Sequence, residues 1–278
     1  MPIYFPTRLD RLIHQSLSGK HDHLANRHKE YLPNFIVIGA AKSATTSLAA
    51  ILRKHSQIHF SSAKEPKFFG RNYVRGWSWY AKFFEKGKDM PLRGEASTMY
   101  TSTNRCFRYT PELIKYHLGD IKLIYLVRNP LERLISHWRH YRGRHQDCPE
   151  LNQILKSRLL KNHILGSSLY FQQLKRYLDV FPREMIYCMT YEELTGNPKK
   201  TLLNLFEFLE IKKETRKILR HGKLPKRNTA GSKGRELVDR PTLEPHIKMK
   251  ILEAIKPDAE QMLSYMGCPH DTWDFAND

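Results

Sequence analysis

The chain has 278 residues and is strongly basic, with 47 Lys and Arg against 28 Asp and Glu and a formal net charge of +19. The length allows one large α/β domain or two small ones. Because no linker-like or repeated segment divides the chain, we expect a single domain over 34–278 behind a basic arm over 1–33. A hydrophobic fraction of 40% can build a core, but no apolar run reaches the ~18 residues that a membrane span needs.

The arm over 1–33 is rich in basic residues and His, and it lacks the apolar block of a signal peptide. We expect its first part, residues 1–20, to be a mobile tail rather than an arm docked over a site. The 4 cysteines are scattered, with no C-x-x-C pair and no metal-ligand spacing, so we expect no metal site. Together with the absence of a membrane anchor, these cysteines favour a reduced, cytoplasmic setting.

The first strand and helix of the domain are predicted at 35–38 and about 45–54. An apolar run is followed by a short loop with Lys42 and several hydroxyls, and then by a helical pattern. A helix N-terminus presents unpaired backbone N–H groups and the positive end of the helix dipole. This strand–loop–helix unit therefore predicts an anion-binding site.

The loop does not match the nucleotide-binding pattern G-x-x-x-x-G-K-[ST]. Counted from Gly39, the second glycine would fall at Ala44 and the lysine at Thr45, so that only Thr46 fits. The lysine of this chain, Lys42, comes three residues earlier, on the strand side of the turn. The sequence thus predicts a phosphate-type loop that differs from a Walker loop.

A second apolar strand, predicted at 122–127, leads directly into another helix, predicted at 130–145. Asn129 is a good N-cap for this helix. Arg128 stands at the carboxyl end of the strand and Ser136 lies about two turns along the helix. A guanidinium fork and a hydroxyl suit a phosphate dianion, whereas a Walker B motif would place an Mg²⁺-binding aspartate at this strand end.

The remaining pattern predicts an α/β fold with a central parallel sheet flanked by helices, because short apolar strands alternate with amphipathic helices. Further strands are expected at about 57–60 and 185–189, and further helices at 111–118, 169–180, 198–209 and 242–256. Ligands of such sheets bind beyond the carboxyl ends of the strands. Lys42 and Arg128 both follow strands directly, so both are expected at that edge.

Three segments resemble those of sulfotransferases that use 3′-phosphoadenylyl sulfate (PAPS). Lys42-Ser-Ala-Thr-Thr-Ser47 is similar to the K-[ST]-G-T-T-x loop for the 5′-phosphosulfate, with Ala44 in place of glycine, which predicts a negative φ or an altered loop there. The stretch 126–136 is similar to the 3′-phosphate motif of an arginine and a serine eight residues later. Ser232-Lys-Gly-Arg235 is similar to the nucleotide-covering loop of heparan sulfate N-sulfotransferases.

The resemblance implies a P-loop-like domain and an enzyme that moves the sulfuryl group of PAPS to a hydroxyl or amine by in-line displacement. The product adenosine 3′,5′-bisphosphate (PAP) is a good leaving group, so no metal is expected, and Lys42 would stabilise charge on the bridging oxygen. Tyr170, near the start of the helix predicted at 169–180, belongs to the core stripe of that helix and is alternatively a candidate contact of the adenine. The nucleotide-binding residues implied in this way are Lys42, Ser43, Ala44, Thr45, Thr46, Ser47, Arg128, Ser136, Tyr170, Ser232, Lys233, Gly234 and Arg235.

The acceptor needs a general base, for which Glu65 is the first candidate. The segment 64–69 is similar to the K-E-x-x-F-F segment of heparan-type members, whose glutamate has this role. Glu95, in a stretch similar to the bacterial G-E-x-[ST]-P-x-Y, and His59 are competitors; a histidine pKa suits a base, but the K-T-H motif of cytosolic members is absent. Ala96 stands where eukaryotic 3-O-sulfotransferases have a lysine that contacts both substrates.

Two other functions suit parts of the sequence. A P-loop nucleotide kinase is disfavoured by Ala44, Thr45 and Arg128, and a polyanion- or nucleic-acid-binding module by the ordered motifs. The basic segment 212–235 leads into the covering loop, where it suits the polyanion PAPS.

The acceptor stays open among glycans, natural products such as polyketides, and small amines. The sequence does not indicate an oligomeric state.

Overall fold

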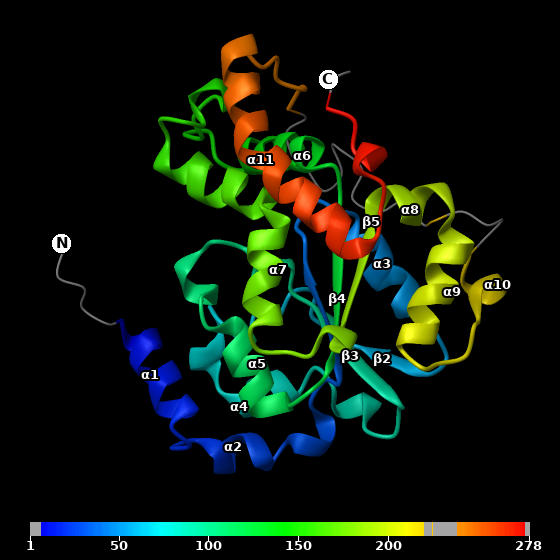
Figure 1. Ribbon diagram of the computed structural model, residues 1–278. Coiled ribbons are helices and arrows are strands. Elements are labelled where there is room, and N and C mark those ends of the chain that lie inside the picture. The colour runs from blue at the N-terminus through cyan, green and yellow to red at the C-terminus, as the bar shows by residue number, and fades with distance from the viewer. Residues whose placement is uncertain (1–6, 220–223, 225–237, 276–278) are drawn as a thin grey trace.

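The computed structural model describes residues 7–219, 224 and 238–275. Its centre is a sheet of 5 parallel strands in the order β2-β3-β1-β4-β5. The strands are β1 (Phe35–Gly39), β2 (Ile58–Phe60), β3 (Leu92–Ala96), β4 (Lys122–Val127) and β5 (Ile186–Thr190). Figure 1 shows helices on both sides of this sheet, which confirms the predicted α/β class.

Each helix predicted from the sequence is present, and α11 extends ten residues beyond its expected end. The helices are α1 (Arg8–Leu17), α2 (Asp22–Asn26), α3 (Thr45–Leu52), α4 (Trp77–Ala81), α5 (Thr110–Leu118), α6 (Pro130–Arg142), α7 (Tyr170–Leu178), α8 (Tyr191–Gly196), α9 (Pro198–Phe208), α10 (Thr215–Ile218) and α11 (Pro245–Met266). Among the residues that the structure describes, no helix is both long enough and apolar enough to span a membrane.

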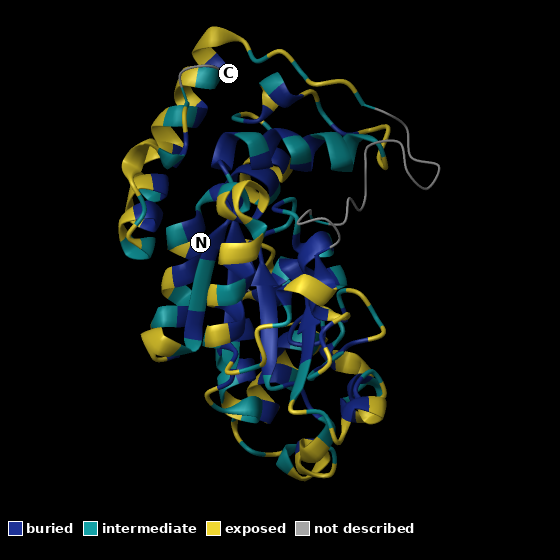
Figure 2. Ribbon diagram, turned by 90° about the vertical axis from the view of Figure 1, so that its right-hand side faces the viewer, coloured by how far each residue is buried: buried dark blue, intermediate teal, exposed yellow. Residues whose placement is uncertain are grey.

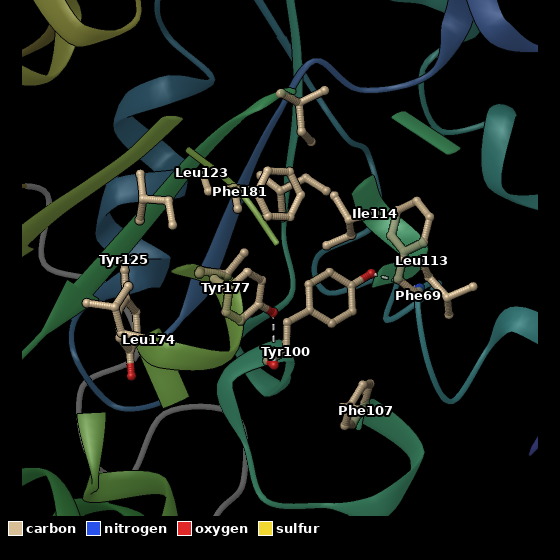
Figure 3. Close-up of a cluster of buried hydrophobic side chains, with 14 of the residues drawn as sticks. Phe69, Tyr100, Phe107, Leu113, Ile114, Leu123, Tyr125, Leu174, Tyr177 and Phe181 are labelled. Carbon is tan, nitrogen blue, oxygen red and sulfur yellow. Dashed lines mark hydrogen bonds between the residues drawn. The ribbon is translucent and has the colours of Figure 1, made fainter. Parts of the chain in front are cut away.

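The sheet is buried on both faces, as a parallel sheet between helices must be. In β1, Ile36 and Ile38 point into a cluster with α4, α5 and α7, whereas Phe35 and Val37 point into a second cluster with α3 and α9. Figure 2 shows the strands buried beneath helices whose outer faces are exposed. Figure 3 shows part of the first cluster. The strand ends are therefore held on a rigid support.

The N-terminal arm is folded, which corrects the expectation of a mobile tail over 1–20 for the residues from 7 onward. Thr7 begins α1 with a capping box, and Ile13 is only 2% exposed within the first cluster. Tyr73 donates a hydrogen bond to Ser16 at 2.7 Å and thereby ties α1 to the domain. The amphipathic pattern of α1 gives it an apolar face that packs on the core. The domain boundary after residue 33 stays a prediction.

Candidate functional site

A large cleft of about 1960 Å³ lies at the carboxyl ends of the neighbouring strands β1 and β4. After β1 the chain crosses to β2 at one edge of the sheet, whereas after β4 it crosses to β5 at the opposite edge. This is the topological switch point at which open α/β sheets bind ligands. The loop after β1 and the loop after β4 both line the cleft, with Lys42 in the first and Arg128 in the second. The structure thus brings together the two motifs that the sequence separates by more than 80 residues.

The loop after β1 has an unusual backbone. Lys42 and Ala44 lie in the left-handed region, with φ of 74° and 63°, so the expectation of a negative φ at Ala44 was wrong. This conformation costs a residue with a Cβ about 1–3 kcal/mol, which is why glycine is usual at such a position. Ala44 is the N-cap of α3 and makes no side-chain cap hydrogen bond, and the N-terminus of α3 with its positive dipole end faces the cleft. The residues of this loop that line the cleft are Ala41, Lys42, Ala44, Thr45, Thr46 and Ser47.

Ser43 and Tyr170 lie apart from the cleft, unlike the other predicted ligands described so far. Both side chains are at most 1% exposed, and neither lines the cleft. The ring of Tyr170 packs against Tyr125 and Trp273, with centroids 6.1 and 5.9 Å away. Tyr170 is therefore a core residue of α7, and the expected contact with adenine is not supported.

Arg128 extends from the carboxyl end of β4 into the cleft. Its Nη2 lies 3.1 Å from Glu132 Oε2, and its guanidinium stacks at 4.8 Å on the ring of Tyr191. Asn129 caps α6 as expected, accepting from the backbone N–H groups of Leu131 and Glu132. Ser136 lines the same cleft. A guanidinium held by a carboxylate and a ring is pre-oriented, which suits recognition of an anion.

Glu65 also lines the cleft, on a loop next to the loop after β1. Its Oε1 accepts a hydrogen bond from Thr98 at 3.0 Å, and its Oε2 pairs with Lys67 Nζ at 3.1 Å. Lys64, beside it in the sequence, donates from Nζ to Thr46 Oγ1 at 2.5 Å and so joins the two loops. The carboxylate is thus oriented, partly exposed and close to the predicted sulfuryl-binding loop.

The two competing candidates for the base, His59 and Glu95, do not line the cleft, so the geometry gives their catalytic role no support. His59 lies on β2, where its Nε2 bonds the carbonyl of Phe83 at 3.0 Å and its ring packs on Gly87. Glu95 on β3 is 0% exposed and is surrounded by hydroxyl donors. Neither group can contact an acceptor in this arrangement.

The opposite wall of the cleft is formed by residues that the sequence analysis missed. It carries side chains of α6, of the segment after it and of a π-helical turn at Leu160–Leu165, a type of irregularity often found at functional sites. In the sequence, the short basic and His-rich stretch after Trp138 was the one feature that could have indicated this wall. The residues concerned are His137, His140, Tyr141, Arg144, His145, Arg158, Asn162 and His163.

His137 is held in one protonation state by a buried arginine. Arg133 is 0% exposed, and its Nη1 donates to His137 Nδ1 at 3.0 Å. Because a guanidinium can only donate, Nδ1 accepts and the ring proton lies on Nε2. Burial and the charge of Arg133 lower the pKa of His137 well below its usual value. His137 is therefore a neutral imidazole at the wall of the cleft.

The cleft is strongly cationic. Among the described residues that line it, Glu65 is the one carboxylate. The lysines and arginines that line it are Lys42, Lys64, Lys67, Arg71, Arg105, Arg128, Arg144 and Arg158. Low-dielectric walls lined by charges of one sign attract ligands of the opposite sign. The predicted covering loop Ser232–Arg235 lies outside the described residues.

Comparison with known proteins agrees with this geometry. The family model described as "Sulfotransferase domain" matches residues 32–234. The chain is 27% identical to the membrane-associated sulfotransferase kil1 of Dictyostelium discoideum, over 65% of this chain and 56% of that protein. It is 28% identical to human heparan sulfate glucosamine 3-O-sulfotransferase 3A1, over 68% of this chain and 47% of that protein. The chain thus spans about half the length of these curated relatives.

A solved structure agrees over nearly the whole chain. The sulfotransferase from Alicyclobacillus acidocaldarius superimposes with a TM-score of 0.69 at 23% identity, covering 87% of this chain and 98% of that one. This likeness confirms the P-loop-like α/β fold. Since the family model covers most of the domain, the protein belongs to the sulfotransferase family.

Proposed function

We propose that the protein transfers the sulfuryl group of PAPS to a hydroxyl or amine of an acceptor by direct in-line displacement, releasing PAP. The observation that carries this proposal is the meeting of two anion-binding segments and one carboxylate in a single cleft. Lys42 and the start of α3 form the first segment, Arg128 and Ser136 the second, and Glu65 is the carboxylate. Sulfotransferase family membership supports the same reaction.

The two segments divide the nucleotide between them. The N-terminus of α3 with Thr45 and Thr46 suits the 5′-phosphosulfate, and Arg128 with Ser136 suits the 3′-phosphate. In-line transfer of a sulfuryl group needs positioning and stabilisation of charge on the leaving oxygen. Lys42 supplies that positive charge from the strand side of the loop. Closure over the nucleotide by Ser232–Arg235 stays a prediction.

Glu65 is proposed as the general base. As the acceptor oxygen or nitrogen forms its bond to sulfur, its proton passes to the Glu65 carboxylate, while the bond from sulfur to the leaving phosphate breaks. Thr98 and Lys67 orient the two carboxylate oxygens, each of which keeps a free lone pair for the acceptor proton. Geometry favours Glu65 over Glu95 and His59, since only Glu65 lines the cleft.

A kinase or a nucleic-acid-binding module has less support. The position after β4 that would hold an Mg²⁺-binding aspartate carries Arg128 instead, which attracts phosphate rather than a cation. The basic residues converge inside a cleft, whereas a nucleic-acid footprint is typically a patch or stripe on the surface. The kinase alternative is tested by the melting experiment with ATP and Mg²⁺ in the Discussion.

Arg128→Ala is expected to weaken PAP binding much more than binding of adenosine 5′-phosphosulfate, which lacks the 3′-phosphate. Loss of a hydrogen bond to a charged group costs about 1.5–3 kcal/mol, so the affinity for PAP should fall roughly tenfold or more. Calorimetric titration of both nucleotides measures the difference. Arg183→Ala is the matched control, because Arg183 stacks on Tyr265 at the same 4.8 Å but lies away from the cleft. Equal losses for the two nucleotides would make Arg128 a structural residue.

The acceptor is proposed to be anionic. Arg71, Arg144 and Arg158 line the cleft beyond the proposed nucleotide contacts, and no ion pair within the described ranges joins them to a carboxylate. Two relatives are named for heparan sulfate, which is consistent with such an acceptor. Desolvating these cations without an anionic partner would be costly. A glycan or natural product that carries carboxylate or sulfate groups therefore suits the cleft best.

A matched pair of acceptors tests this proposal. A uronic-acid oligosaccharide and its methyl ester offer the same hydroxyls but differ in charge. The acid is expected to have a kcat/KM about ten- to a hundredfold higher, corresponding to one or two charge-assisted contacts. Arg144→Ala with Arg158→Ala should reduce that preference and leave PAP affinity unchanged. An ester used as well as the acid would contradict an anionic acceptor.

A further inference from the structure

Glu95 is a buried carboxylate at the centre of a hydrogen-bond network. It lies on β3 opposite Ile36 of β1 and is 0% exposed. Tyr80 and Tyr100 donate to its Oε1 at 3.1 and 2.9 Å, and Ser97 donates to its Oε2 at 2.6 Å. A carboxylate is acceptor-only, so all these hydroxyl protons point toward Glu95. The lone pairs of the hydroxyls are then turned outward and can accept.

Two of these hydroxyls accept hydrogen bonds from the loop that carries Glu65. The backbone N–H of Lys67 donates to Ser97 Oγ at 2.8 Å, and that of Phe69 donates to Tyr100 Oη at 3.1 Å. Figure 3 shows Tyr100 pointing at Phe69 from the cluster beneath the loop. The loop is thus fastened to the sheet at two backbone positions, both of which lead to the same buried carboxylate.

The loop needs such fastening because its backbone is unfavourable. Glu65 and Lys67 both have left-handed φ values, 58° and 52°. Conformations of this kind persist in residues with a Cβ only where the surroundings impose them, and they gather at functional sites. The same two residues form the ion pair that orients the Glu65 carboxylate at the cleft.

We propose that Glu95 is a positioning residue, which holds the 65–69 loop through Ser97 and Tyr100 so that Glu65 is presented to the acceptor. Glu95 does not touch the substrates and does not accept the acceptor's proton. The inference rests on the proposed function, in which Glu65 is the base. The fastening of the 65–69 loop by Ser97 and Tyr100 is independent of the reaction that takes place in the cleft.

The network is sensitive to protonation of Glu95. A protonated carboxyl group would donate one hydrogen bond, so one of the three hydroxyls of Tyr80, Ser97 and Tyr100 would have to reverse. At Ser97 or Tyr100 the reversed hydroxyl would still have to accept from the loop N–H, which can only donate. Burial and, to a smaller extent, the charge of Glu65 raise the pKa of Glu95 to about 7, against the opposing effect of its hydroxyl donors. Burial also raises the pKa values of Tyr80 and Tyr100 well above 10, so these groups stay protonated. Glu95 is therefore the carboxyl group through which this network responds to pH near neutrality.

Glu95→Gln replaces the ionisable carboxylate by an amide of nearly the same volume. The amide does not titrate, and its NH₂ group donates where a carboxylate oxygen accepted. Amide hydrogen exchange of Lys67 and Phe69 is expected to accelerate, because their acceptors are no longer fixed. The kcat of transfer should fall by up to about a hundredfold, the range of a small misplacement of a catalytic group. Because the ionised carboxylate holds the network, the wild-type rate is expected to rise with pH as Glu95 ionises near pH 7, and this rise should be absent in Glu95→Gln. PAP affinity should change by less than about twofold, which is less than the loss of one hydrogen bond would cause.

Tyr177→Phe is the matched control. Tyr177 is buried in the same cluster and donates to the carbonyl of Tyr100 at 3.0 Å, as Figure 3 shows, whereas the hydrogen bonds to Glu95 come from Tyr80, Ser97 and Tyr100. Its loss should leave the exchange of Lys67 and Phe69 and the pH profile unchanged. If Glu95→Gln does not fold, Ser97→Ala removes the link to Lys67 alone and decides the question by the same measurements.

The outcomes separate this inference from the proposed function. Unchanged exchange at Lys67 and Phe69 in Glu95→Gln, or an equal change in Tyr177→Phe, would overturn the positioning role, even if the wild-type enzyme transfers sulfate from PAPS. Accelerated exchange limited to the Glu95 and Ser97 variants would support it, even if the wild-type protein shows no transfer. A kcat and a pH step identical to those of the wild type would also contradict the role.

Discussion

Glu65→Gln is expected to lower the single-turnover rate of sulfuryl transfer by about 10²–10⁴-fold, the usual effect of losing a general base. The amide preserves the volume and can still accept a hydrogen bond from Thr98, which now lies 3.0 Å from Oε1, but it cannot take a proton from the acceptor. The fold and PAP affinity should therefore be retained. Rapid mixing of enzyme-bound PAPS with acceptor measures the chemical step, and calorimetry measures PAP binding.

The control for this variant is Glu207→Gln. Glu207 pairs with Lys213 at 3.1 Å, the same distance as Glu65 to Lys67, but on the surface of α9. Its loss should change neither rate nor binding, since exposed pairs contribute little. A Glu65→Gln rate above roughly a tenth of the wild-type value would place the base elsewhere. His163→Asn would be the next variant, because His163 lines the same cleft.

Lys42→Ala is expected to reduce kcat by about 10²–10³-fold, as removal of one electrostatic stabiliser does in other enzymes. Charge on the bridging oxygen grows only toward the transition state, so PAP affinity should change far less than kcat. Steady-state kinetics and PAP titration give the two quantities. Lys54→Ala is the control, because Lys54 follows the C-terminal end of α3 and does not line the cleft. A collapse of affinity with an unchanged kcat would make Lys42 a binding residue.

The sequence predicted those parts of the fold that have strong local signals. The strands β1 and β4 are continuous apolar runs, and Asn129 caps α6 as its residue type indicates. Strand β3 was not predicted because Leu92–Ala96 contains Arg, Gly and Glu, which are poor strand formers. Its place between β2 and β1 is decided by tertiary packing, including the burial of Glu95 by the hydroxyls around it.

The site was predicted where it depends on strand ends and missed where it depends on packing. Lys42, Arg128 and Ser136 follow strands of one sheet, so their convergence follows from topology. Tyr170 lies in the core, as the apolar stripe of its helix predicted, and the alternative contact with adenine has no support in the geometry. His137 and the π-helical turn after it could not be assigned to the cleft, because only the folded chain brings α6 and that turn together.

Thermal unfolding in the presence of nucleotides tests the central claim most directly. The protein is melted in buffer with EDTA, alone and with PAP, and separately with the same concentration of ATP plus Mg²⁺. We expect PAP to stabilise the native state without metal, by about 2.7 kcal/mol at a hundredfold excess over its Kd, and more than ATP with Mg²⁺ does. A melting shift that appears only with ATP and Mg²⁺, and not with PAP, would contradict the account.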